Sequence, residues 1–264
     1  MSGSVQNLIW TLVGAVVGYG LPRLYEEIKY RITVERQARM LWGWAKGRTL
    51  NVVITTDEES QDGLEDDAAE SVFATEARAA AELQSYINSA GIESGVKVWS
   101  SASFETGKHD DEDILSIGGP VNNSYSDRIL QELENQLPYV INGHAIERVG
   151  TAGERSWEAE LTKGEVARDY ALVVRAPNPL GGSASVIVVA GSRTHGSLIG
   201  TRALRIGHKN ESRKDGIRAQ LESALGGKLN DRFAFVVEGT VRGDDHTGKL
   251  TVVDAAYLLV PERS

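Results

Sequence analysis

Two glycine-rich turns carry the residues best suited to bind a ligand. The first turn, IGGPVNNS, follows the apolar run DILSI and precedes a helix-like segment. Gly118 and Gly119 let a ligand approach the backbone closely, while Asn122, Asn123 or Ser124 is suited to cap the helix that follows. Free N–H groups at such a helix start, together with the helix dipole, attract anions. This turn is therefore a candidate site for a phosphate group.

The second turn, VAGSRTHGS, repeats this construction after the run SASVIVV. It adds hydroxyl groups, a positive charge and an imidazole to the glycines. We expect the following residues to contact the same ligand: Gly191, Ser192, Arg193, Thr194, His195 and Gly196. Neither turn has the G-x-G-x-x-G dinucleotide pattern or the G-x-x-x-x-G-K-[ST] phosphate loop. The alternative is that the glycines only permit tight turns and the polar residues only cap helices.

Few other side chains have a spacing that indicates chemistry. Asp57 follows the apolar run LNVVITT, where a carboxylate could bind a ribose or act as a base. It belongs to an acidic tract, residues 57–70, that fits no calcium loop and is typical of a solvated loop leading into a helix. The five histidines show no metal-ligand spacing, cysteine is absent, and no G-x-S-x-G elbow marks a nucleophilic serine. The sequence therefore predicts no metal site and no cofactor, and it assigns no catalytic residue.

Apolar runs that alternate with helix-like segments must position these turns. Residues 50–56, 96–100, 113–118 and 183–191 have the pattern of buried strands. The middle of the chain favours short antiparallel strands, and its last part favours a β-hairpin. This order predicts an α/β fold: a doubly wound, mostly parallel, Rossmann-like sheet with antiparallel additions. In open parallel sheets ligands bind beyond the carboxyl ends of the strands, so ligand binding is favoured if the two glycine turns face a common cleft there, and a scaffold is favoured if side chains or a second subunit fill them.

The N-terminus has the pattern of a membrane anchor. No charged residue occurs in residues 1–22, and residues 7–22 are nearly all apolar or small. Basic residues follow, beginning with Arg23 and Lys29, which by the positive-inside rule places the rest of the chain in the cytoplasm. We therefore expect a single-pass inner-membrane protein with an anchor over 1–22, a helical stalk over 23–48 and a cytosolic α/β domain over 49–264. The alternative is a buried or oligomer-forming helix.

Composition and spacing also bear on partners. The net charge of −9 argues against binding to nucleic acid. Gly14 and Gly18 form a G-x-x-x-G pair that would let two membrane helices approach closely, which favours a homo-oligomer. Trp42 and Trp44 are expected to pack where the stalk meets the domain. Lipid, a second copy and a small anionic ligand are thus the expected partners.

Several positions of this chain match a wider pattern. The turn GGP-x-N and the stretch DYALVVRAPNPLGGSASVIVVAGSRTHGSLIGTRAL resemble a group of prokaryotic Rossmann-like domains, with related patterns in archaeal surface-layer-type proteins. The similarity spans residues 111–206. It implies a Rossmann-like fold and a sensor role, and it brings no catalytic residues. The matching positions are Gly118, Gly119, Pro120, Asn122, Asp169, Tyr170, Asn178, Pro179, Gly191, Gly196 and Ser197.

These patterns rank three functions. The first is a membrane-anchored sensing module that binds a nucleotide-type anion and acts by oligomerisation, as in signalling or defence effectors of prokaryotes. The second is a nucleotide or nucleoside hydrolase or transferase that uses Asp57, Arg193 and His195. The third is a self-assembling structural scaffold in which the glycine turns bind nothing. The position of the two turns in the fold discriminates among them.

Overall fold

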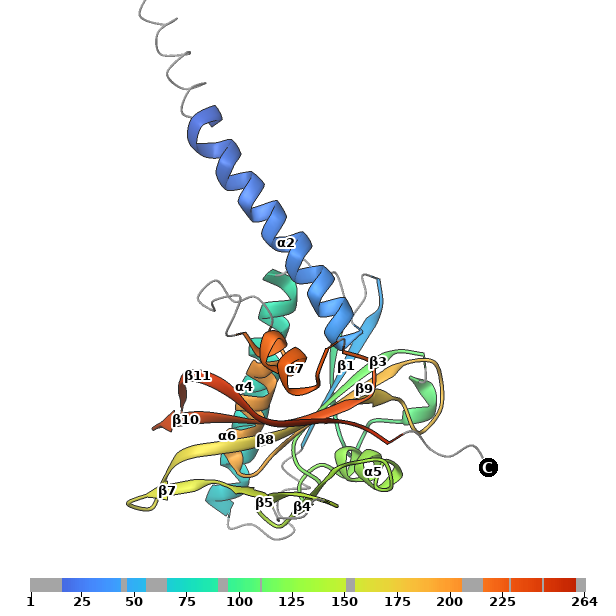
Figure 1. Cartoon of the computed structure of the whole chain (residues 1–264). Helices are drawn as coiled ribbons and strands as arrows, with labels where there is room; N and C mark the ends of the chain where they lie inside the picture. Colours follow the sequence, from blue (N-terminus) through green and yellow to red (C-terminus); the bar gives the residue numbers. More distant parts are fainter. Residues whose placement is uncertain are drawn as a thin grey trace, which may run out of the picture.

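A mixed β-sheet organises the chain (Figure 1). Its strand order is β11-β10-β8-β9-β3-β1-β2, with β7 paired to β8. Strands β2, β1, β3 and β9 run parallel, whereas β8, β10 and β11 are antiparallel to their neighbours. The strands of this sheet are β1 (Thr49–Ile54), β2 (Gly95–Ser100), β3 (Asp113–Ile117), β7 (Glu160–Thr162), β8 (Glu165–Pro177), β9 (Ser185–Gly191), β10 (Phe233–Arg242) and β11 (Asp245–Tyr257).

Helices cover both faces of this sheet. The computed structural model describes residues 16–43, 47–55, 66–89, 95–109, 111–150, 155–205, 216–227, 229–243 and 245–259. Within them, the chain forms helices α2 (Leu21–Trp42), α4 (Asp66–Ser89), α5 (Ser124–Glu132), α6 (Thr194–Ala203) and α7 (Ile217–Ala224), and also a π-helical turn (Val16–Gly20) and a 3-10 turn (Thr106–Lys108). One apolar cluster joins α4, α6, α7 and the end of α2 to one face, and a second cluster places α5 on the other.

Alternation along the strands creates these two cores. In β1, Val52 belongs to the cluster under α4 and α6, and its neighbour Val53 belongs to the cluster under α5. In β9, Val188 and Val189 divide in the same way. A strand buried on both faces reads as a continuous apolar run, as these strands do. The α/β class expected from the sequence is confirmed.

The sheet contains more antiparallel pairing than the sequence predicted. Strand β8 was expected among the antiparallel additions, yet it lies in the middle of the sheet between β9 and β10. Its centre, Tyr170–Ala176, is buried on both faces, so its apolar pattern matches that of a parallel strand. Burial fixes the pattern but not the direction of a central strand. The predicted C-terminal hairpin is confirmed as β10 and β11.

A small second sheet lies against the main one on the α5 side. It has the order β4-β5-β6 and is antiparallel, as the sequence predicted. Arg148 of this sheet forms an ion pair with Asp254 of β11, and Ile146 packs into the core shared with α5. Its strands are β4 (Tyr139–Asn142), β5 (Ala145–Arg148) and β6 (Ser156–Glu158).

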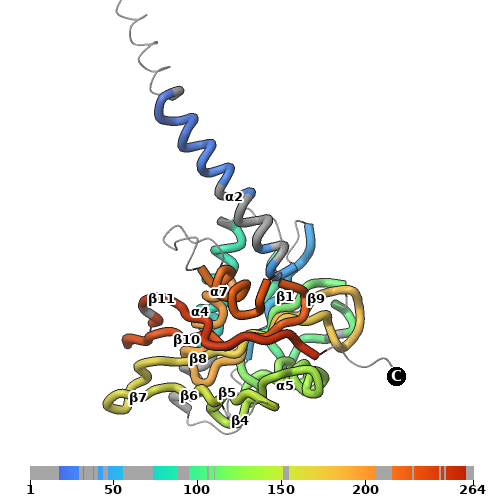
Figure 2. The backbone as a smooth tube through the Cα atoms, in the orientation of Figure 1, coloured from blue at the N-terminus to red at the C-terminus, as the bar shows by residue number. Residues whose placement is uncertain are grey.

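Helix α2 stands out from the domain and is attached only through its last turns (Figure 1, Figure 2). Ala38, Leu41 and Trp42 are buried in the core, and the Trp42 indole donates a hydrogen bond to the carbonyl of Leu204 at 2.8 Å. Trp42 therefore packs at the junction as expected, whereas Trp44 lies outside the described residues.

The predicted membrane anchor falls largely outside the described part of the chain. Residues 1–15, including Gly14, are not described, and the remainder of the segment forms the π-helical turn and the start of α2. Among the described residues, no helix has both the length and the apolar character needed to cross a bilayer.

Candidate functional site

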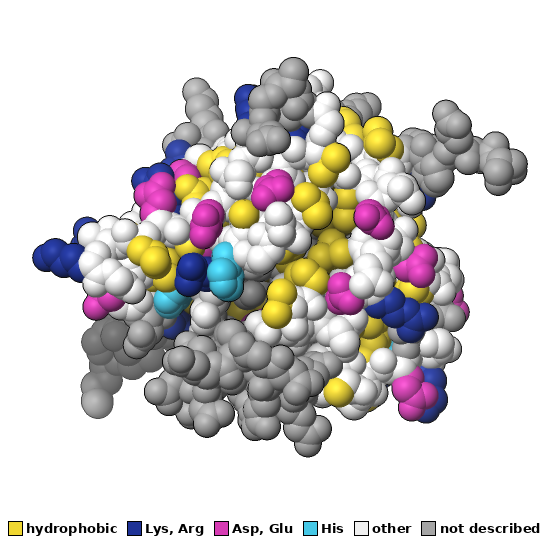
Figure 3. Space-filling view, turned by 90° about the horizontal axis from the view of Figure 1, so that it is seen from below, with side chains coloured by type: hydrophobic (Ala, Val, Ile, Leu, Met, Phe, Trp, Pro, Cys, Tyr) yellow, Lys and Arg dark blue, Asp and Glu magenta, His cyan; other side chains and the backbone are white. Residues whose placement is uncertain are grey.

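The two glycine turns lie side by side at one edge of the sheet. The N–H of Gly118 donates to the carbonyl of Val189 at 2.9 Å, and a Cβ on Gly119 would stand 3.7 Å from the carbonyl oxygen of Gly191. The structure therefore brings together the two segments that the sequence singled out. Figure 3 shows this end of the molecule, at which α4 and α6 begin, with hydrophobic side chains lining a shallow hollow and acidic side chains around it.

The turn after β3 is placed where crossover connections diverge. Helix α4, which follows β1, packs with α6 on one face, and α6 itself follows β9. Helix α5, which follows β3, packs on the opposite face. Strand β3, which ends at the turn Gly118–Gly119, lies between β1 and β9. The helix that follows β3 lies on one face of the sheet, and the helices that follow β1 and β9 lie on the opposite face. Open α/β sheets bind ligands outside the carboxyl ends of strands at such switch points.

Gly118 makes room for a buried carboxylate. Its φ is +122°, and a Cβ there would lie 2.5 Å from Oε1 of Glu76 and 2.9 Å from Oγ1 of Thr55. Glu76 is only 2% exposed, and its Oε2 accepts a hydrogen bond from the N–H of Thr55 at 2.9 Å. The Thr55 hydroxyl has no hydrogen-bond partner among the described residues. One side of the turn is therefore closed by Glu76.

Sequence reasoning missed Glu76, although a signal for it existed. The residue stands four positions before Ala80, seven before Leu83 and eleven before Ile87. All of these side chains are buried on α4, so Glu76 continues the apolar stripe of that helix. An acidic residue on such a stripe indicates a buried carboxylate. Because Glu76 follows the acidic tract 57–70, it was not distinguished from the exposed acids of that tract.

The helix after the first turn is capped by Asn123. Its Oδ1 accepts from the N–H of Ser126 at 2.9 Å, and its Nδ2 donates to the carbonyl of Ile117 at 2.9 Å. Asn123 is fully buried, whereas Asn122 is partly exposed. The capping role proposed for this group of residues thus belongs to Asn123, and the buried asparagine of the motif is not Asn122.

The second turn already holds an anion of its own. The carboxylate of Asp169, which is fully buried, accepts hydrogen bonds from the N–H groups of Tyr170 (2.8 Å), Arg193 (3.2 Å) and Gly196 (2.7 Å). Burial raises the pKa of this carboxyl to about 6, although these N–H donors favour its charged form. Asp169 therefore occupies the place at the start of α6 where an external anion was expected.

The glycines of the second turn serve close packing. A Cβ on Gly191 would lie 2.5 Å from the backbone nitrogen of Ser197, and one on Gly196 would overlap the carbonyl oxygen of Tyr170. Gly200 likewise lets α6 approach β8 and β9, because a Cβ there would meet Val189 at 2.5 Å. These positions need glycine for the fold.

Ser192 joins the second turn to the small sheet. Its Oγ donates to the carbonyl of His144 at 2.7 Å and accepts from the N–H of Ala159 at 3.2 Å. The side chain is buried, so its hydroxyl is committed to these contacts. Thr194 and His195 lie in the first turn of α6 and are partly exposed. Ser192 is thus structural, although the sequence grouped it with the ligand contacts.

Arg193 differs from its neighbours. Among the described residues its guanidinium forms no ion pair and no hydrogen bond, and its Nε is buried without a partner, although its charge lowers the pKa of the buried Asp169 carboxyl. It is partly exposed and lies two residues after Gly191, whose carbonyl borders Gly119. A guanidinium with unused hydrogen-bond donors therefore belongs to the second glycine turn, whose backbone borders the first. Asp57, the acid of the enzyme hypothesis, lies outside the described residues.

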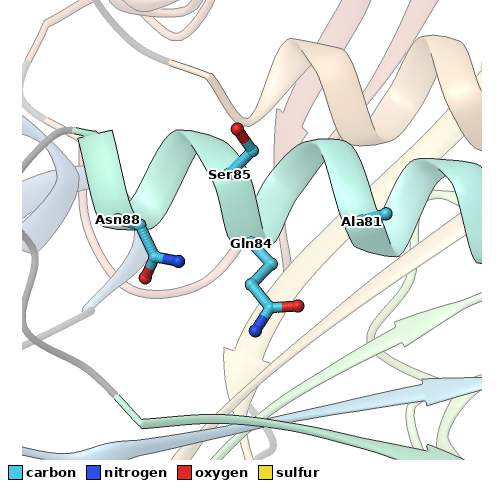
Figure 4. A pocket seen from close by; sticks show the side chains of 4 residues that line it. All are labelled: Ala81, Gln84, Ser85 and Asn88. Atoms are coloured by element: carbon cyan, nitrogen blue, oxygen red, sulfur yellow. The ribbon is translucent and has the colours of Figure 1, made fainter.

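A separate groove follows the exposed side of α4 (Figure 4). It is lined by Ala81, Gln84, Ser85 and Asn88, which all belong to this helix. The side chains of Ser85 and Gln84 point to different sides of α4, so no polar groups converge on one point. This groove has no contact with the glycine turns. In the part of the chain that is described, no cluster of histidine and acidic side chains could hold a metal ion.

Comparison with known proteins adds no family to this description. No family model matches the sequence, and no curated protein is significantly similar to it.

Proposed function

We propose that the chain is a membrane-anchored α/β module that binds a small anionic ligand of nucleotide type at the turn Gly118–Gly119. Binding there would change contacts between domains and lead to self-association at the inner membrane. The domain faces the cytoplasm in this proposal, because basic residues follow the uncharged segment 1–22.

The guanidinium of Arg193, which has no hydrogen-bond partner among the described residues although its charge acts on Asp169, carries this proposal. Elsewhere on the described surface, arginines such as Arg148 and Arg202 are paired with carboxylates. A partly exposed arginine with a buried, unpartnered Nε has hydrogen-bonding capacity that the protein does not use. Arginine binds phosphate through two parallel hydrogen bonds, so a phosphate group would satisfy it.

The surroundings limit how such a ligand could lie. Asp169 occupies the start of α6, and Glu76 closes the far side of Gly118, so an anion can approach only on the side of Gly119 and Arg193. A nucleotide presents its phosphates at the end of the molecule, so a phosphate could enter from this side while the rest of the nucleotide stays outside the turn.

Calorimetry with the full chain in mild detergent tests this proposal. Adenosine and guanosine mono-, di- and triphosphates are the probes, and Arg193→Ala is compared with Arg242→Ala, which removes an exposed arginine of β10 far along the hairpin. Loss of a charge-assisted hydrogen bond costs about 1.5–3 kcal/mol, so Arg193→Ala should weaken binding about 10- to 100-fold. Equal effects of the two variants, or no binding of any probe, would contradict the proposal.

One observation favours a second candidate, a self-assembling scaffold. Asp169 fills the start of α6 from inside, so the second glycine turn has a structural explanation without a ligand. A scaffold would form the same oligomer with and without nucleotide. Light scattering of the detergent-purified chain across the nucleotide panel separates the two, since only a sensor changes its mass on addition of ligand.

A further inference from the structure

The first half of α2 presents an apolar stripe that its own domain does not cover. Leu21, Tyr25, Ile28 and Ile32 are 52%, 63%, 48% and 60% exposed. Their 4-3-4 spacing places them on one face of the helix. The helix contacts the domain only through its last turns, so this stripe lies clear of it (Figure 1). Exposed apolar surface of this kind indicates an interaction site.

The stripe is too short to form a stable coiled coil with a second copy. It covers twelve residues, whereas coiled coils need three or four heptads of apolar seam. Continuation of the same spacing reaches Glu35 and Arg39, so the seam ends in charged residues. A second copy is therefore a poor occupant for this face.

The flanking residues match a lipid surface instead. Arg23 lies over the ring of Tyr19 at 5.1 Å, and Lys29 lies over the ring of Tyr25 at 5.8 Å. Tyrosine and basic side chains gather at the level of lipid headgroups. Residues 23–39 contain five basic and three acidic residues, an excess that anionic lipid would attract.

The junction before the stripe allows the helix to change direction. Residues 16–20 form a π-helical turn, and Pro22 follows it. Proline has no N–H, so it cannot donate to the carbonyl four residues earlier, at Gly18. Helices bend at such places. The uncharged segment that ends here can therefore enter the bilayer while α2 turns along its surface.

We propose that residues 21–32 of α2 lie on the anionic surface of the membrane, with Leu21, Tyr25, Ile28 and Ile32 inserted between headgroups. This inference rests on the proposed membrane anchor and goes beyond it, because it replaces a stalk that projects from the membrane by a helix that lies on it. The domain would then be held close to the bilayer at a fixed orientation through Trp42.

Site-specific fluorescence in the full chain tests this arrangement. The sequence has no cysteine, so Ile28→Cys and Glu26→Cys each introduce one labelling site, and the two positions are on opposite faces because they are about 200° apart around the helix. Each variant is labelled with an environment-sensitive dye and bound to vesicles of phosphatidylcholine with and without phosphatidylglycerol. Doxyl-labelled lipid should quench the dye at 28 several-fold more than at 26, and more strongly when phosphatidylglycerol is present.

Other outcomes overturn the inference in distinguishable ways. If the chain floats with the vesicles and both dyes are equally accessible to water, the anchor holds and α2 is a projecting stalk. If the dye at 28 is shielded but not quenched, and oxidation links Ile28→Cys chains in pairs, a second copy covers the stripe. A chain that does not float with either vesicle contradicts both the anchor and this inference.

Discussion

Replacing Asp169 by asparagine should change how the stability of the fold depends on pH. The carboxylate is buried and its pKa is raised to about 6 by burial, against 3.8 for an ordinary aspartate. Between these two values the folded state binds more protons than the unfolded state. Stability from this group is therefore fully present below pH 3.8 and is lost as pH rises through about 6.

The size of the effect follows from the shift in pKa. At 1.36 kcal/mol for each pKa unit, a shift of this size corresponds to about 3 kcal/mol. Asp169→Asn removes the titration. Its amide places a donor against one of the N–H groups of Arg193 or Gly196, as the protonated carboxyl of the wild type also does at pH 4. The variant should therefore be close to the wild type in stability at pH 4, and the free energy of unfolding of the wild type should fall by about 3 kcal/mol relative to the variant by pH 8.

Urea unfolding of the detergent-purified chain, followed by circular dichroism at pH 4 and pH 8, measures this change. Asp127→Asn, on the partly exposed side of α5, controls for the removal of one negative charge. If Asp169→Asn and the wild type lose or gain stability in parallel across this range, the carboxylate is not the buried, raised-pKa group that the structure indicates, and the account of the second glycine turn fails.

Other variants test the packing around the site and the junction. Gly118→Ala should destabilise the fold about 1–3 kcal/mol more than Gly181→Ala, because both positions have φ near +120° but only the first would meet Glu76. If the two variants lose equal free energy of unfolding in urea, the loss comes from backbone strain at positive φ, and the predicted clash with Glu76 is contradicted. Trp42→Ala should cost about 3–5 kcal/mol, since it empties a fully buried site and leaves the carbonyl of Leu204 without its donor. A change in melting temperature as small as that of an exposed substitution on α2 would contradict this role of the junction.

The sequence predicted the parts of the fold that depend on burial pattern and local signals. Continuous apolar runs predicted the strands, and glycine and asparagine predicted the turns. Asn123 illustrates why: a cap depends on its own neighbours in the chain. The structure adds that the two turns lie side by side. The antiparallel direction of β8 was expected correctly, but its length and its central place in the sheet were not, because the partners of a strand are set by distant segments of the chain.

The site was predictable only in its outline. Asp169 lies 24 residues before Arg193 in the sequence, and nothing in its neighbourhood shows that its carboxylate ends at the start of α6. Asp169 matched the resemblance to Rossmann-like domains through the pair Asp169-Tyr170, but that resemblance assigned it no role. Arg193 was expected beside the glycine turns, and the structure adds that its guanidinium is unpaired among the described residues. The place of the Asp169 carboxylate and the partners of the Arg193 guanidinium both depend on contacts between distant segments of the chain, which the local sequence does not show.

Native mass spectrometry of the intact protein, purified gently in detergent, tests the central claim most directly. The wild type is compared with Gly119→Val, whose Cβ would stand 3.7 Å from the carbonyl oxygen of Gly191, and circular dichroism checks that the valine leaves the fold unchanged. The valine would nevertheless block close approach of a ligand to the turn. We predict a bound small molecule of nucleotide mass on the wild type and its loss from Gly119→Val. A wild-type chain that carries no small molecule and gains none from added nucleotides would contradict ligand binding at this turn.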